Sequence, residues 1–269
     1  MMSTTQLLAN RIRQNALKMV HRAKASHIGS ALSITDILAV LYGEVMRFNP
    51  ADQHDKLRDR FILSKGHACV AVYSTLAEVG FIPKEQLDTY GEDFSWLMNH
   101  ISHKVNGVEF STGSLGHGLP FGVGKALAAR ARGENWRTFV LLSDGEMDEG
   151  TNWEALMFAA HHKLTNLTAI IDYNKLQSLD SIANTLALEP FVDKLKAFGC
   201  EVHEIDGHNH ELIAEALTII SDEKPTVIVA HTIKGKGVSF MENRIEWHYK
   251  NPNDEQLAIA LAELELAHA

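Results

Sequence analysis

The chain has 269 residues, of which 45% are hydrophobic and 22% are charged, with 18 glycines and 6 prolines. This composition is typical of a folded globular protein and excludes disordered and fibrous classes. With 25 Lys and Arg against 34 Asp and Glu, the net charge is −9, which argues against a nucleic-acid partner or an anionic membrane surface.

Two helices are predicted near the N-terminus. Apolar residues recur at helical intervals over Gln6–Lys24, and a second apolar run covers Ile37–Met46. The residues from Ser33 to Asp36 have the pattern of a capping box that would start the second helix. The segment Ser26-His27-Ile28-Gly29-Ser30 is then expected to be a loop, and it is the first candidate for a site.

Beyond residue 60, short apolar strands alternate with helices. The predicted strands are Arg60–Ser64, Thr138–Leu142, Leu167–Asp172, Glu201–Ile205 and Thr226–His231. The predicted helices are Ala68–Val79, Gly122–Arg130, Trp153–His161, Phe191–Phe198, Glu211–Ile220 and an amphipathic one in Pro252–Ala269. This alternation predicts an α/β fold, a parallel sheet with helices on both faces. No repeat, linker or low-complexity tract divides the chain, so we expect a single domain over residues 1–269.

One stretch does not follow the alternation. Phe94 to Val123 is rich in Gly and His and shows little periodicity. An irregular stretch of this length in a compact domain is usually functional. We therefore expect site residues there.

Two observations bear on the compartment. The chain has no run of about 18 apolar residues and no signal-peptide pattern. Cys69 and Cys200 stand far apart without a CxxC pairing, which favours neither a disulfide framework nor a zinc site. We expect a cytoplasmic protein with no membrane partner.

Ligands of open parallel sheets bind at the carboxyl ends of the strands. Ser143-Asp144-Gly145 follows one predicted strand, and Tyr173-Asn174-Lys175-Leu176 follows another. Side by side, the Asp144 carboxylate and the Asn174 amide oxygen would offer the hard oxygen ligands that Mg²⁺ takes. Because Mg²⁺ completes its shell with waters and phosphates, a diphosphate cofactor is the expected missing partner. Gly145 would let the backbone approach it closely.

These residues resemble a known motif. Asp144-Gly145, followed by Asn174 thirty positions after Asp144, is similar to the thiamine diphosphate motif, which usually opens Gly-Asp-Gly and closes on Asn. With Ser26–Gly29, Leu63–Ala68 and Ser111–Gly118 in this order, the chain resembles the N-terminal, diphosphate-binding domain of transketolases over nearly its whole length. The resemblance implies a thiamine-diphosphate-binding fold. It also implies an enzyme that transfers a two-carbon ketol unit between a ketose and an aldose.

The resemblance assigns expected roles residue by residue. The metal, Mg²⁺ or in its place Ca²⁺ or Mn²⁺, would be held by Asp144, Asn174 and the main-chain carbonyl of Leu176. The cofactor would be bound by His67, Gly113, Leu115, Asp144, Gly145, Asn174 and His248, the last a weaker match because its flanking residues differ. The expected catalytic residues are His27 and His100 at the reacting carbons, and Glu149 and Glu154 on a path that links paired active sites.

The chain also departs from the family pattern. Ser143 stands where the motif usually has its first glycine, which is tolerable if that position needs no positive φ. His117 stands where many full-length transketolases have Gln. The family's second domain, which holds the glutamate that activates the aminopyrimidine, and its third domain have no counterpart here.

The missing domains imply partners. We expect a C-terminal transketolase-like subunit, with copies of this chain touching as a homodimer within a heterotetramer. Sugars, phosphorylated ones above all, are the expected small-molecule substrates, and the residues do not specify which. Two alternatives stay open: the α-subunit of a 2-oxo-acid dehydrogenase, which shares the Asp-Gly…Asn motif, and a non-catalytic thiamine-diphosphate-binding module.

Several residues have plainer readings. His103 follows His100 by three positions and leaves a second alignment for that histidine. Lys234-Gly235-Lys236-Gly237 lacks the spacing of a Walker motif and is expected to be a basic turn after a strand. Four further histidines are expected at the surface, namely His161, His162, His208 and His210.

Overall fold

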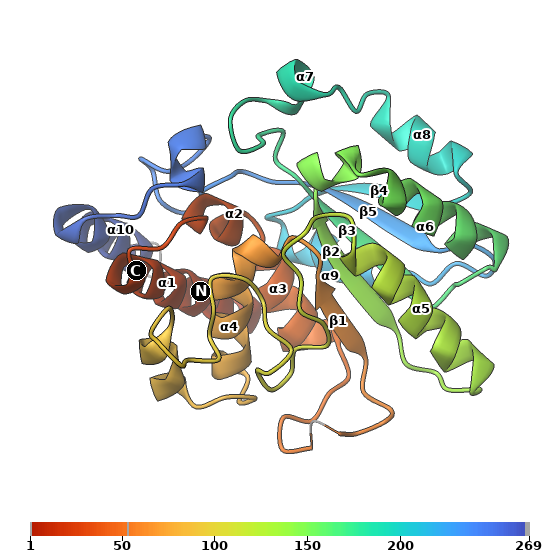
Figure 1. Ribbon diagram of the computed structural model, residues 1–269, viewed down its shortest axis with the longest axis horizontal. Helices are drawn as coiled ribbons and strands as arrows, with labels where there is room; N and C mark the ends of the chain where they lie inside the picture. Colours follow the sequence, from red (N-terminus) through yellow and green to blue (C-terminus); the bar gives the residue numbers. More distant parts are fainter. Residues whose placement is uncertain (1, 53, 267–269) are drawn as a thin grey trace.

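The computed structural model describes residues 2–52 and 54–266, and its centre is a five-stranded sheet (Figure 1). The strands are β1 (Arg60–Leu63), β2 (Thr138–Ser143), β3 (Leu167–Tyr173), β4 (Glu201–Asp206) and β5 (Thr226–His231). Their order across the sheet is β1-β2-β3-β5-β4, and every pairing is parallel. The predicted parallel sheet is confirmed, and each predicted strand ends within one residue of the observed one.

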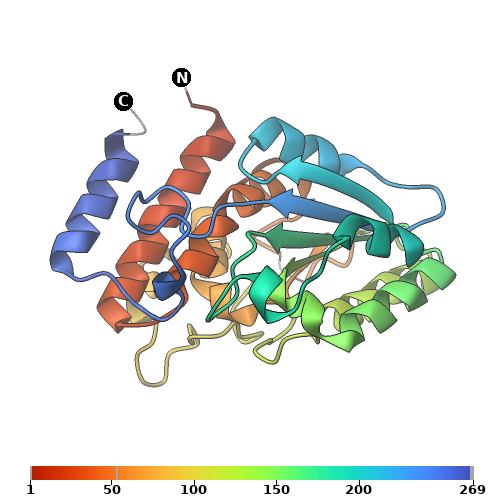
Figure 2. The same ribbon diagram turned by 90° about the horizontal axis from the view of Figure 1, so that it is seen from above.

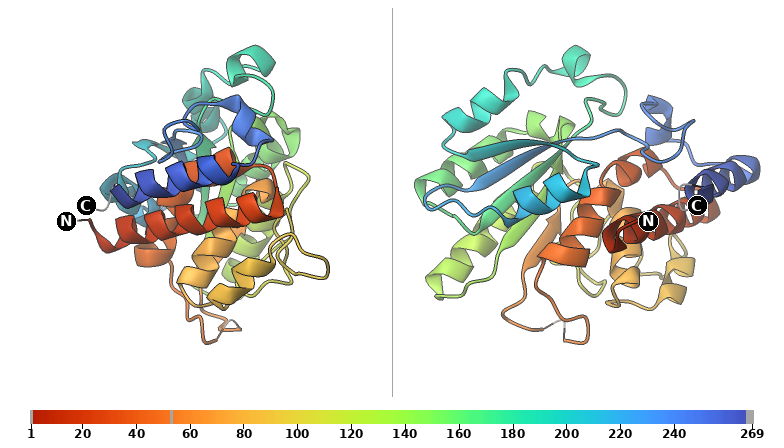
Figure 3. Two further views of the ribbon diagram at one scale, coloured as in Figure 1. Left: turned by 90° about the vertical axis from the view of Figure 1, so that its left-hand side faces the viewer. Right: turned by 180° about the vertical axis from the view of Figure 1, so that it is seen from behind.

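Helices precede, connect and follow these strands. They are α1 (Thr4–Ala23), α2 (Ile28–Ser33), α3 (Thr35–Val40), α4 (Cys69–Glu78), α5 (Gly118–Ala131), α6 (Gly150–His161), α7 (Ile182–Thr185), α8 (Phe191–Ala197), α9 (His210–Thr218) and α10 (Asp254–Leu266). The helix predicted within Pro252–Ala269 is present as α10, which packs beside α1 (Figure 3), while residues 267–269 lie outside the described residues. None of the helices in the described ranges is long and apolar enough to cross a bilayer.

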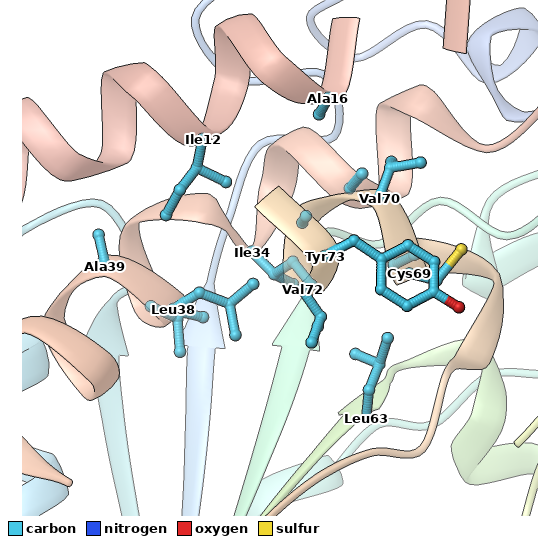
Figure 4. Packing of buried hydrophobic residues seen from close by; sticks show 14 of the residues in the cluster. Ile12, Ala16, Ile34, Leu38, Ala39, Leu63, Cys69, Val70, Val72 and Tyr73 are labelled. Carbon is cyan, nitrogen blue, oxygen red and sulfur yellow. The ribbon is translucent and has the colours of Figure 1, made fainter. Parts of the chain in front are cut away.

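The sheet separates two apolar cores. Side chains alternate along a strand, so Phe61 and Leu63 of β1 enter one core and Ile62 enters the other. The first core lies between the sheet and α1, α3, α4 and α9 (Figure 4). The second lies under α5, α6 and α8, on the opposite face (Figure 2). The prediction of helices on both faces is therefore confirmed.

The capping-box prediction at Ser33 is wrong. Helix α2 already begins at Ile28, inside the expected loop, and α3 starts at Thr35 with no side-chain cap. Ser33 is fully buried, and its hydroxyl lies 3.0 Å from the Ser30 carbonyl and 2.6 Å from an Asp172 carboxylate oxygen. Its side chain therefore does not cap a helix N-terminus but links the preceding turn of α2 to the distant Asp172.

A buried carboxylate, Asp36, connects α3 with Arg13 of α1 and with two histidines near the start of α9, at the edge of the first core. Arg13 donates two hydrogen bonds to it, at 3.0 and 2.5 Å. Burial alone would raise the pKa of Asp36, but Arg13 and hydrogen bonds with His208 and His210 outweigh it and hold that pKa well below its usual range. The prediction that His208 and His210 lie at the surface is wrong, because Asp36 draws both rings inward to 2.7 and 3.1 Å.

We expect Asp36→Ala to lower the free energy of unfolding by about 3–5 kcal/mol at pH 7, since it leaves the Arg13 guanidinium buried without its partner. Because the folded pKa of Asp36 is lowered, this stabilisation is complete above the unfolded pKa of about 4 and is lost as pH falls through the lower folded value. Urea denaturation measures both effects. The matched control is Glu223→Ala, which breaks the exposed 2.8 Å pair with Lys163 and should leave stability nearly unchanged. Equal losses in the two variants would contradict the assignment.

Candidate functional site

A cavity of about 260 Å³ lies at the carboxyl ends of β1, β2, β3 and β5, which contribute Lys65, Asp144, Asn174 and Lys234 to its wall. Loops that are distant in sequence complete the lining. The residues expected from the sequence that line it are His27, His67, His100, Gly113, Leu115, Asp144, Gly145, Asn174, Leu176 and His248. The structure thus gathers into one space ten residues that were selected on sequence pattern.

The sheet register places Asp144 beside Asn174. Ser143 of β2 pairs with Asp172 of β3, so the two residues follow neighbouring strand ends. Burial, and then the nearby Asp172 carboxylate, raise the pKa of Asp144 to about 7. Its carboxylate is 1% exposed and accepts only the backbone N–H groups of Gly145 and Lys175. No ion pair in the described part of the chain includes it.

That environment fits a small hard cation. A buried carboxylate that forms no ion pair is costly, and a divalent ion would relieve it. Asn174 and Leu176 line the same cavity, and their amide and carbonyl oxygens are of the neutral kind that Mg²⁺ or Ca²⁺ accepts beside one carboxylate. In residues 2–52 and 54–266, no group of three or more His, Cys, Asp or Glu is arranged so that it could hold a metal ion, so a transition-metal site of that type is not formed there.

Asp172 lies behind the cavity wall, where it contacts the lining residues Lys65 and Asn174, although its sequence position in a buried strand did not single it out. Its carboxylate lies 2.5 Å from Lys65 Nζ, and the two side chains are 0% and 1% exposed. Burial opposes ionisation, but Lys65 and the hydroxyls of Ser33 and Thr232 outweigh it and lower the pKa of Asp172. Asn174 Nδ2 also donates to this carboxylate, at 3.0 Å. The bond fixes which end of the Asn174 amide is the oxygen.

A second buried carboxylate, Glu146, ties the surrounding loops together. It accepts the Ser64 hydroxyl at 2.5 Å, the Gly116 N–H at 2.9 Å and the Ser143 N–H at 3.3 Å. These three segments lead directly to His67, Leu115 and Asp144. Burial raises the pKa of Glu146. Sequence reasoning missed it because a glutamate in a loop is ordinarily solvated.

Four histidine rings form one wall of the cavity. The centroid of His27 lies 5.0 Å from those of His67 and His248 and 5.8 Å from that of His100. Burial is the main cause that lowers the pKa of His27 to about 4, that of His248 to about 3, and that of His67 well below its usual value. The rings are therefore neutral at pH 7, and each offers one donor and one acceptor.

His27 is held in an unusual backbone conformation. Its φ is +75°, in the left-handed region that disfavours residues with a side chain. Its N–H donates to the His248 carbonyl at 2.8 Å, which couples the two histidines through the main chain. Such strain persists only where surrounding contacts over-determine it, and it is common at functional sites.

Lys234 is a site residue that sequence reasoning missed. The predicted turn is present, with Gly235 and Gly237 both at positive φ. The Lys234 side chain nevertheless turns inward and is 1% exposed, and its Nζ donates to the carbonyls of Leu176 and Gln177. Burial, and then Lys65, lower the pKa of Lys234 to about 8. A lysine directly after a strand end was the available signal.

Three candidates lie outside the cavity. Glu149 and Glu154 are exposed at the start of α6. His103 is exposed, with its Nδ1 2.6 Å from the Ser111 hydroxyl; of the two alignments, the one with His100 puts an imidazole in the cavity. A larger hollow of about 740 Å³ is lined by His208 and His210, but both rings are already bonded to Asp36.

Comparisons with known proteins agree with the geometry. Residues 4–265 match the family model described as "Transketolase, thiamine diphosphate binding domain". The chain is 42% identical over 263 residues to one subunit of the apulose-4-phosphate transketolase of Phocaeicola vulgatus, covering 97% of this chain and 94% of that one. It is 40% identical to the 6-deoxy-6-sulfo-D-fructose transketolase subunit SqwG of a Clostridium species, covering 96% of this chain and 94% of that one.

Solved structures and longer relatives give the same likeness over part of their length. The transketolase of Campylobacter jejuni superimposes with a TM-score of 0.93 at 30% identity, covering 98% of this chain and 43% of that one. Human transketolase is 35% identical over 243 residues, which is 39% of its length. The chain thus spans most of these two bacterial transketolase subunits and about two-fifths of the longer transketolases.

The lowered pKa of His27 predicts how the free energy of unfolding depends on pH. Between its unfolded value of 6.5 and its folded value of about 4, His27 binds a proton only when the chain is unfolded. The free energy of unfolding should therefore fall as pH is lowered through this window. Chemical denaturation at several pH values should give a shallower slope for His27→Asn, whose replacement tolerates the left-handed backbone. His161→Asn, at an exposed position, is the control and should keep the wild-type slope. An unchanged slope in His27→Asn would contradict the assignment.

Proposed function

Because this chain belongs to the transketolase family, we propose that it is the N-terminal subunit of a two-component transketolase, which transfers a two-carbon ketol unit between a ketose and an aldose. The observation that carries the proposal is the meeting of Asp144, Asn174 and four neutral imidazoles in one cavity at the strand ends. One residue set thus offers oxygen ligands for a metal–diphosphate and, beside them, groups that move protons.

We propose that Asp144, Asn174 and the Leu176 carbonyl hold Mg²⁺, with Ca²⁺ or Mn²⁺ as substitutes. The support is the buried Asp144 carboxylate, which forms no ion pair in the described residues and whose pKa is raised by burial. His67 and the backbone of Gly145 bind the diphosphate in this proposal, and Gly113 and Leu115 pack against the cofactor. A side chain at Gly145 would meet Gln177 at 3.0 Å, which favours a glycine there.

Bound thiamine diphosphate supplies an electron sink for the carbanion left when a ketose carbon–carbon bond breaks. The residues of this chain have other tasks. His27 and His100 accept protons from sugar hydroxyls and return them, which a neutral imidazole does near neutral pH. The ring N–H groups of these two histidines also stabilise the negative charge that develops on the sugar oxygens. His248, next to His27, is proposed to bind the cofactor or substrate as a further donor.

The mouth of the cavity supports a protein partner. Tyr249, which lines the cavity, is 56% exposed, and the exposed Leu179 and Met98, at 81% and 56%, lie within two residues in sequence of the lining residues Ser178 and His100. Exposed apolar groups around a site are typical of a surface that another protein covers. We propose a C-terminal transketolase-like subunit as that partner, which brings the glutamate that activates the aminopyrimidine.

A second contact is proposed between copies of this chain, within a heterotetramer. Helix α6 exposes Met157 and Phe158, at 53% and 42%, close to Glu149 and Glu154. In this arrangement the two glutamates lie at the contact and connect paired sites. Cys69 and Cys200 are buried free thiols, in keeping with the proposed cytoplasmic location.

Sugar phosphates are the proposed substrates. The printed names of two relatives specify apulose 4-phosphate and 6-deoxy-6-sulfo-D-fructose, and both compounds carry a strongly acidic group. An anionic ketose donor is accordingly the first class to assay with this chain and its partner.

We expect Asp144→Ala to abolish Mg²⁺-dependent binding of thiamine diphosphate, because it removes the charged metal ligand. Asn174→Ala should weaken binding less, by about 10–100-fold, because a neutral oxygen is lost. Calorimetric titration with and without Mg²⁺ measures both. Asp180→Asn changes an exposed carboxylate outside the cavity and is the matched control. Unaltered affinity in the Asp144 variant would overturn the metal assignment.

The function itself is tested by reconstitution. The purified chain should bind cofactor yet lack ketol transfer, and a partner carrying the second and third transketolase-like domains should restore it. An assay with ketose and aldose phosphates measures this, and size-exclusion chromatography follows the assembly. Full activity without a partner would refute the two-component proposal. Turnover of 2-oxo acids in place of ketoses would instead point to a 2-oxo-acid dehydrogenase subunit, and cofactor binding without turnover under any partner to a non-catalytic module.

A further inference from the structure

All the hydrogen-bonding capacity of Lys234 is used within the protein. An ammonium group has three N–H donors and no acceptor. Lys234 Nζ lies 3.0 Å from the Leu176 carbonyl, 2.9 Å from the Gln177 carbonyl and 3.2 Å from His248 Nδ1. The side chain is buried, so these three acceptors account for its three protons.

The third contact determines where His248 carries its proton. Because Lys234 can only donate, Nδ1 of His248 must present its lone pair. A neutral imidazole then has its single proton on Nε2, on the other side of the ring. In the described residues the ring of His248 makes its hydrogen bond through Nδ1 and none through Nε2, and His248 lines the cavity.

We propose that Lys234 is a positioning residue that fixes His248 in the Nε2–H tautomer, so that His248 presents an N–H donor to an oxygen atom of the molecule bound in the cavity. The tautomer follows from this chain alone. The identity of the acceptor rests on the proposed function and is either a phosphate oxygen of the cofactor or a hydroxyl or carbonyl oxygen of the sugar.

The surrounding backbone keeps both partners in place. Gly235 N–H donates to the Gly29 carbonyl at 3.0 Å, and Asn243 N–H donates to the Lys234 carbonyl at 2.9 Å. The His248 carbonyl accepts the His27 N–H at 2.8 Å. The contact between Lys234 and His248 therefore joins two anchored segments, which is what a fixed tautomer requires.

The molecule contains an internal reference with the opposite tautomer. His208 Nε2 accepts the backbone N–H of Ile233 at 2.8 Å, while its Nδ1 faces an Asp36 oxygen at 2.7 Å. A backbone N–H can only donate, so His208 carries a proton on Nδ1. His208 and His248 should thus give opposite signatures in one spectrum.

The test is ¹⁵N NMR of the histidine rings in the full chain without ligand at pH 7, where the two tautomers give different coupling patterns. The spectrum of His248→Gln identifies the His248 signal. We expect a protonated Nε2 in the wild type and in Lys234→Arg, which keeps a donor, and a mixture of tautomers in Lys234→Met. An unchanged His208 signal reports that the variants are folded. A protonated Nδ1 in the wild type, or a Lys234→Met spectrum identical to it, would overturn the proposal.

Kinetics of the reconstituted enzyme identify the acceptor. If His248 donates to the cofactor, Lys234→Met should raise the KM for thiamine diphosphate about tenfold; if it donates to the sugar, kcat/KM for a ketose phosphate should fall about tenfold instead. The part of either effect that acts through the His248 ring should vanish in a His248→Gln background, whereas the part due to the lost hydrogen bonds to the Leu176 and Gln177 carbonyls should remain. Full additivity of the two substitutions, or no effect on either constant, would overturn the donor role. An enzyme that reconstitutes without activity would count against the proposed function, while the NMR result would still decide the tautomer.

Discussion

The buried ion pair between Lys65 and Asp172 holds the catalytic end of this sheet together. Two charges without solvent contact are tolerated only when every remaining donor and acceptor is satisfied. Here Lys65 arrives from the end of β1 and Asp172 sits on β3, while hydroxyls from α2 and from the end of β5 complete the carboxylate's shell. Each partner would be an uncompensated buried charge without the other. The positions of three strand ends therefore depend on one interaction.

The same charges set the character of the cavity wall. Lys65 and Lys234 are among the causes that depress the pKa values of His67, His27 and His248. They would also attract an anionic ligand. Burial is the main cause that keeps these histidines neutral, and the two lysines that favour phosphate add to it, because a like charge opposes protonation. The same cavity can therefore attract a diphosphate and contain neutral histidines that both accept and donate protons.

Sequence reasoning succeeded where a residue's role follows from its place on a strand. Asp144 and Asn174 follow strand ends and carry oxygen, so the fold class alone brings them together. It failed where the partner is distant. Lys234 lies 58 positions from Leu176, and its place shortly after a strand end does not by itself distinguish an inward lysine from a solvated one. Ser33 and His208 were misassigned for the same cause, since local patterns pair polar side chains with the nearby backbone or with water. Their buried partners, Asp172 and Asp36, are visible only in the folded chain.

The alternation of β1 side chains between two cores limits how such a sheet can change in length. A one-residue insertion or deletion within a strand exchanges the faces of every residue beyond it. It also displaces the following loop by about 3.3 Å, which for β2 or β3 would separate Asp144 from Asn174. One such insertion or deletion would therefore both destabilise the fold and disrupt the site. Insertions and deletions among descendants of this chain should therefore occur mainly at the amino ends of the strands and in the outer loops, where a change in length does not move the core or the site residues.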